Sequence, residues 1–80
     1  RSQIQQIDEK MIKLIAERMK LAQELGLKKK ELGLPVRDDK REKILFEVWE
    51  EIAKKENLNP RLIDELWSII LDESIRIQSI

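Results

Sequence analysis

Hydrophobic residues recur at alternating steps of three and four through the first part of the chain, from Ile4 to Lys30. The positions in this register are Ile4, Ile7, Met11, Leu14, Arg18, Leu21 and Leu25. Such spacing predicts a long amphipathic α-helix whose narrow apolar stripe packs against another helix. Gly26 is the only weak point of this helix, and Gly33-Leu34-Pro35 ends it, because glycine accepts a left-handed cap and proline cannot continue the turn.

The rest of the chain predicts two shorter helices. The second begins near Asp38 or Asp39, either of which can cap it, and Asp39 with Glu42 three residues later has the spacing of a capping box. The third begins after Asn59, a good N-cap, with Pro60 at the first helical position. We therefore expect one all-α domain of three helices. The expected ranges are 1–80 for the domain and about 1–32, 38–55 and 60–79 for the helices.

The first predicted helix is too long for the other two to cover. Thirty helical residues span about 45 Å. Part of the apolar stripe would therefore remain exposed in a monomer. Pairing with a second copy is the simplest remedy, and two-fold symmetry is the commonest arrangement, so we expect a homodimer.

Composition and charge exclude several classes of function. The chain is 41% hydrophobic and 40% charged, with 16 basic and 16 acidic residues, and this balance argues against a nucleic-acid or membrane-surface binder. It shows no membrane-spanning stretch or signal peptide, and we expect a cytoplasmic protein. Cysteine and histidine are both absent, which excludes thiolate nucleophiles and the commonest metal ligands. Any chemistry must therefore use Arg, Lys, carboxylates and amides.

The most informative residues are polar ones on the inward faces of the predicted helices. Arg18 interrupts the apolar stripe and, since a guanidinium keeps its charge, needs an anionic partner if it is buried. Lys29 follows eleven residues later, close to three whole turns, and shares its face. The second and third helices add Asp38, Arg41, Glu42, Ser74 and Gln78.

Each of these residues also has a purely structural interpretation. Arg18 could extend its charged end into solvent, Lys29 suits a helix C-terminus, and Asp38 could be a cap. Their coincidence on three helices nevertheless favours a shared pocket for an anion. Arg1 lies about 25 Å along the helix from Arg18, so the two could grip one small molecule only across an antiparallel pair of first helices. A disordered terminus is the alternative for Arg1.

Taken together, these patterns resemble the all-helical class of chorismate mutases over essentially the whole chain. The resemblance rests on Ile7-Asp8-Glu9, Leu14-Ile15-Ala16-Glu17-Arg18, Lys29, Leu34-Pro35-Val36-Arg37-Asp38, Arg41-Glu42, Ser74 and Gln78. It implies an intertwined homodimer with paired first helices and two equivalent active sites. It also implies a Claisen rearrangement of chorismate to prephenate, at the branch leading to phenylalanine and tyrosine.

The resemblance further implies a role for each residue. Arg18, Lys29, Gln78 and Glu42 would be catalytic. Asp38, Arg41, Ser74 and Arg1 of the partner subunit would bind substrate. A pericyclic rearrangement needs no metal, cofactor or covalent catalysis, only selection of a compact conformer and stabilisation of developing charge. Gln78 would donate a hydrogen bond at any pH, because an amide does not titrate.

Two alternative functions remain open at this point. One is a non-catalytic helical dimerisation module, in which the inward polar residues would be dispensable. The other is an isochorismate pyruvate lyase built on the same fold, which analysis of the products would distinguish.

Overall fold

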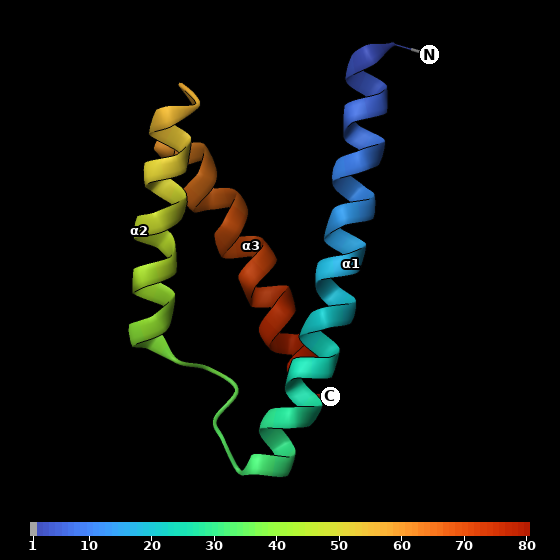
Figure 1. The fold of residues 1–80 in the computed structure, drawn as a ribbon, viewed down its shortest axis with the longest axis vertical. Helices are drawn as coiled ribbons and strands as arrows, with labels where there is room; N and C mark the ends of the chain where they lie inside the picture. Colours follow the sequence, from blue (N-terminus) through green and yellow to red (C-terminus); the bar gives the residue numbers. More distant parts are fainter. Residues whose placement is uncertain (1) are drawn as a thin grey trace.

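Residues 2–80, the part of the chain described by the computed structural model, form three α-helices (Figure 1). Their bounds are α1 Gln3–Leu32, α2 Asp39–Lys55 and α3 Pro60–Gln78. Among residues 2–80 there is no β-strand. The all-α fold class with a long first helix is therefore confirmed. None of the three helices is both long enough and apolar enough to cross a lipid bilayer.

Two of the predicted helix ends are formed by the expected residues. Gly33 has a φ of 69°, and the backbone N–H of Leu34 donates to the Lys29 carbonyl at 2.8 Å, which closes the end of α1. The Asn59 side chain accepts from the backbone N–H of Arg61 at 3.0 Å, with Pro60 as the first residue of α3.

The start of α2 resolves an ambiguity in the sequence. Asp38 is the N-cap, and its Oδ1 accepts from the backbone N–H of Arg41 at 3.1 Å. The capping box suggested by Asp39 and Glu42 is wrong, because Asp39 is already inside the helix and Glu42 binds Arg37. The Arg37 guanidinium offers that carboxylate a charged donor, which is stronger than a backbone amide.

The three helices are connected through the last one. α3 runs diagonally and packs against both α1 and α2, whereas the backbones of α1 and α2 stay apart (Figure 1). The later part of α3 crosses the later part of α1, and its beginning packs against α2 through Trp49 and Trp67, whose ring centroids are 5.7 Å apart. α1 and α2 therefore diverge from each other and are joined through α3 (Figure 1).

The buried apolar core within one chain is small. Among residues 2–80 its members are Ala22, Ala53, Ile70 and Leu71. The chain exposes 6771 Å², whereas a compact monomer of this mass exposes about 5,100 Å². Its radius of gyration is 14.5 Å, compared with about 12 Å expected for a compact chain of this length. One chain thus leaves far more surface uncovered than a self-sufficient domain of its size.

Part of the uncovered apolar surface belongs to the stripe predicted along the first helix, which we call the α1 stripe. Its aliphatic members are largely exposed, for example Ile4 at 73%, Leu14 at 62% and Leu21 at 63%. The complete exposed set on this register is Ile4, Ile7, Met11, Leu14, Leu21 and Leu25. An exposed row of large apolar side chains of this kind marks an interaction site.

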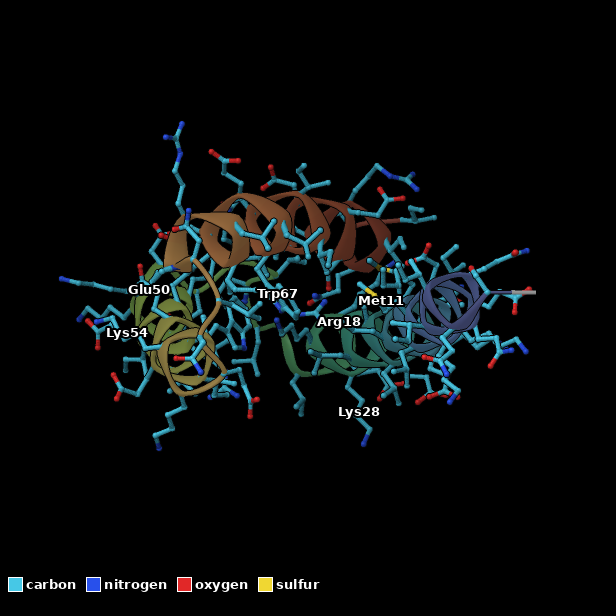
Figure 2. All side chains as sticks on the ribbon, turned by 90° about the horizontal axis from the view of Figure 1, so that it is seen from above. Met11, Arg18, Lys28, Glu50, Lys54 and Trp67 are labelled. Atoms are coloured by element: carbon cyan, nitrogen blue, oxygen red, sulfur yellow. The ribbon has the colours of Figure 1, made fainter. Side chains whose placement is uncertain are left out.

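Two acidic side chains meet where α2 faces α3, at the end of the molecule remote from the α1–α3 crossing. Glu50 shares a hydrogen bond with Asp64, and this bond, followed by the nearby Asp64 charge, raises the pKa of Glu50. Lys54, which lies near Glu50 in Figure 2, opposes the shift, and Glu47 adds to it. Since two ionised carboxylates repel each other, one proton is shared between the helices at low pH.

This pair predicts a stability that falls as pH rises. A carboxyl group whose folded pKa is raised stabilises the fold below its ordinary value near 4.5, and that stability is lost as pH rises through the folded pKa. Glu50→Gln supplies a permanent donor to Asp64, so we expect a higher Tm at pH 7 and a weaker decline of Tm from about pH 4.5 upward. Thermal melts across pH measure this. Glu51→Gln on the exposed face is the control, and equal melts for the two variants would contradict the assignment.

Candidate active site

A polar groove of about 190 Å³ lies where the later part of α1, the start of α2 and the end of α3 come together. The seven site residues predicted within the described range all line it. They are Arg18, Lys29, Asp38, Arg41, Glu42, Ser74 and Gln78. Leu25, Val36, Leu45, Leu71 and Ile75 complete the walls. The eighth predicted residue, Arg1, lies outside the described residues 2–80.

Arg18 stands at the boundary between this polar groove and a second, apolar groove. It is half-buried and makes no hydrogen bond or ion pair within residues 2–80. Figure 2 shows its side chain directed into the space between α1 and the other helices. The apolar groove, of about 210 Å³, is lined by Met11, Leu14, Ile15, Arg18, Leu66, Trp67 and Ile70. A guanidinium left without a partner beside such apolar walls is suited to bind an anion.

Lys29 and Gln78 form a direct link between α1 and α3. Lys29 Nζ donates to Gln78 Oε1 at 2.9 Å and to the Val36 carbonyl at 2.8 Å. Gln78 Nε2 donates at 3.4 Å to the Oγ of Ser74, a residue only 4% exposed. An ammonium has three N–H donors, so Lys29 keeps one for a ligand. The long bond to Ser74 leaves the Gln78 amide nitrogen weakly satisfied and able to donate elsewhere.

Glu42 is held by a residue that the sequence prediction had not included, Arg37. Arg37 Nη2 donates to Glu42 Oε1 at 3.0 Å and Nε donates to Oε2 at 3.0 Å. This hydrogen bond is the main reason why the pKa of Arg37 is raised. Arg37 Nη2 also lies 3.7 Å from Asp72 Oδ1 on α3. Arg37 precedes α2, so helical periodicity could not predict that it contacts Glu42. Its position one residue before the N-cap was the available sequence signal.

The charges around the polar groove favour a small dianion. Arg18 and Arg41 extend from α1 and α2, and neither side chain has a partner within residues 2–80. The negative charge of Glu42 is balanced by Arg37, and Asp38 Oδ1 is occupied in capping α2. Across the described residues, no group of His, Cys, Asp and Glu is arranged to hold a metal ion. The groove therefore offers two free guanidinium groups, with the Lys29–Gln78 donors nearby.

Comparison with known proteins gives one consistent family. The family described as chorismate mutase type II matches residues 1–79. The chain is 40% identical over 78 residues to the bifunctional chorismate mutase/prephenate dehydratase of Buchnera aphidicola from Schizaphis graminum, covering 98% of this chain and 20% of that protein. It is 37% identical to the bifunctional enzyme of Escherichia coli, with the same coverage. The chorismate mutase of Methanocaldococcus jannaschii is 32% identical, covering 98% of this chain and 79% of that protein. The chain thus spans about a fifth of the bifunctional relatives.

Proposed function

Because the chain belongs to the chorismate mutase type II family and has the function of an isomerase of that family, we propose that it converts chorismate to prephenate in the polar groove. The main support for locating the reaction in this groove is the pair of free guanidinium groups, Arg18 and Arg41, on two helices that line it. Chorismate carries two carboxylates, an ether bridge and a ring hydroxyl, and the groove offers a group for each.

The first role of the groove is to select one conformer of the substrate. The rearrangement breaks an ether bond while a carbon–carbon bond forms, so both ends of the side chain must lie over the ring. Arg18 and Arg41 clamp the two carboxylates in bidentate fashion and hold this compact form. Ser74, a buried residue in the lining of the groove, assists by hydrogen bonding.

The second role is to stabilise the charge that develops on the ether oxygen. Lys29 donates its remaining N–H, and Gln78 turns its weakly satisfied Nε2 from Ser74 toward that oxygen. These donors strengthen as negative charge grows on the oxygen, and they therefore favour the transition state over the ground state. Glu42, oriented by Arg37, accepts the ring hydroxyl, with the backbone of Asp38 beside it.

We also propose that the working form is a homodimer in which a second copy covers the α1 stripe. The support is the small core of one chain and the exposed aliphatic residues along α1. An antiparallel pair of α1 helices would bring Arg1 of the partner subunit toward the groove. Action in phenylalanine and tyrosine synthesis and a cytoplasmic location remain predictions from the sequence.

A spectroscopic assay tests the proposed activity. The wild-type chain should convert chorismate to prephenate, which is measured as a loss of the absorbance of chorismate. In a separate assay with isochorismate as the substrate, it should release no pyruvate. Lys29→Met should lower kcat by about 10²-fold or more, the usual effect of removing one donor to a developing oxyanion. Lys28→Met is the matched control, because the neighbouring Lys28 points away from the groove (Figure 2). A folded wild type without turnover would contradict the proposal, and equal activities of the two variants would contradict the role of Lys29.

A further inference from the structure

α1 and α3 approach each other very closely at Gly26. A Cβ atom added there would lie 2.6 Å from both the Cα and the carbonyl oxygen of Gln78, and 3.0 Å from its carbonyl carbon. These are backbone atoms, so no side-chain rotation can relieve the contact. Any residue other than glycine at this position therefore requires the last turn of α3 to move away from α1.

Glycine is needed at position 26 because there is no room for a side chain, and not because the backbone adopts a conformation that only glycine allows. Within residues 2–80, Gly33 is the only glycine with a positive φ, so Gly26 has an ordinary helical backbone. An alanine would be the better helix former at such a position. Gly26 is also one of the two buried residues of α1, the other being Ala22 one turn earlier. α1 therefore meets α3 through small residues that let the two backbones approach.

This close approach sets the position of a proposed catalytic group. The residue whose backbone touches Gly26 is Gln78, which is only 9% exposed. Its side chain meets Lys29, three residues after Gly26 on the same helix, at 2.9 Å. Moving the last turn of α3 outward would lengthen this link and withdraw the Gln78 amide from the polar groove.

We propose that Gly26 is a positioning residue of the mutase site: its lack of a side chain sets the depth at which Gln78 enters the groove. This inference rests on the proposed function. A methyl group at this position displaces the Gln78 backbone by several tenths of an ångström to about 1 Å, and a displacement of that size at a reacting centre lowers a rate by up to about 10²-fold. Arg18 and Arg41, held by other parts of α1 and α2, keep their places and continue to bind the substrate carboxylates.

The test is Gly26→Ala in the full chain, with kcat and KM measured separately on chorismate. We expect kcat to fall by about 10- to 100-fold while KM changes by less than about threefold. Helix content by circular dichroism and the mass in solution should stay as in the wild type. Ala16→Ser, which adds one atom to the exposed face of the same helix, should leave kcat unchanged.

A double-mutant cycle distinguishes positioning from a general structural effect. If Gly26 acts through the Gln78 amide, Gly26→Ala should lower kcat little further in a Gln78→Ala background. The inference would be overturned if kcat of the double variant fell by the product of the two single effects. It would also be overturned if Gly26→Ala folded with an unchanged kcat, or if Gly26→Ala failed to fold. Absence of turnover in the wild type would instead contradict the proposed function.

Discussion

Arg18→Ala should lower kcat/KM for chorismate by about 10² to 10⁴-fold, because truncating one partner of a desolvated, hydrogen-bonded ion pair costs about 3–5 kcal/mol. The fold should not suffer, since the Arg18 side chain has no hydrogen bond or ion pair within residues 2–80. Removing a half-buried charge without a partner can even raise the free energy of unfolding. Steady-state kinetics and thermal melts on the same preparation measure both effects.

Two further variants make the Arg18 result specific. Arg18→Lys keeps the positive charge but loses the planar fork that grips a carboxylate, so we expect most of the activity to be lost there as well. Arg61→Ala removes an exposed guanidinium that pairs with Glu65 on the outer face of α3, and it should leave kcat/KM unchanged. Near-normal activity of Arg18→Ala would exclude a role for Arg18 as a carboxylate clamp.

Leu14→Glu should dissociate the proposed dimer and abolish most of the activity. Leu14 belongs to the α1 stripe and also lines the apolar groove, yet it is 62% exposed in one chain. Burying a leucine from each of two copies contributes about 3–6 kcal/mol to the dimer. Losing this contribution weakens association by about 10² to 10⁴-fold. The cost of burying two carboxylates at the interface weakens it further.

Ile12 provides the matched control for this experiment. It is a similar aliphatic residue on the same helix, 66% exposed, but it lies two positions away and so projects from nearly the opposite face. Ile12→Glu should keep the dimer mass, twice the 9.6 kDa of one chain, in sedimentation equilibrium. A monomeric wild type, or a Leu14→Glu variant that keeps the dimer mass, would contradict the proposed pairing.

Local features of the chain could be predicted well from the sequence because they depend on residues close to one another. The left-handed cap at Gly33 and the N-cap at Asn59 need only a few neighbouring backbone groups. The convergence of Arg18, Lys29 and Gln78 on one groove was also expected, through helical periodicity and the family resemblance. That they bind substrate stays a prediction.

Features that depend on how the helices cross could not be predicted. Gly26 was interpreted as a weak point of the first helix, whereas the structure places it against the backbone of α3. The pairs Arg37–Glu42 and Glu50–Asp64 were not foreseen either. One involves a residue before a helix start and the other joins two helices, so neither follows from the periodicity of a single segment.

The arrangement in which only the last helix joins the other two has a consequence for the order of folding. Lys29 and Gln78 lie 49 positions apart, and the backbones of α1 and α2 do not pack against each other in a way that could bring these residues together earlier. Closing so long a loop is entropically unfavourable until α3 has formed and can dock. We therefore expect the helices to form first and the polar groove to be assembled in the final step, when the end of the chain reaches α1.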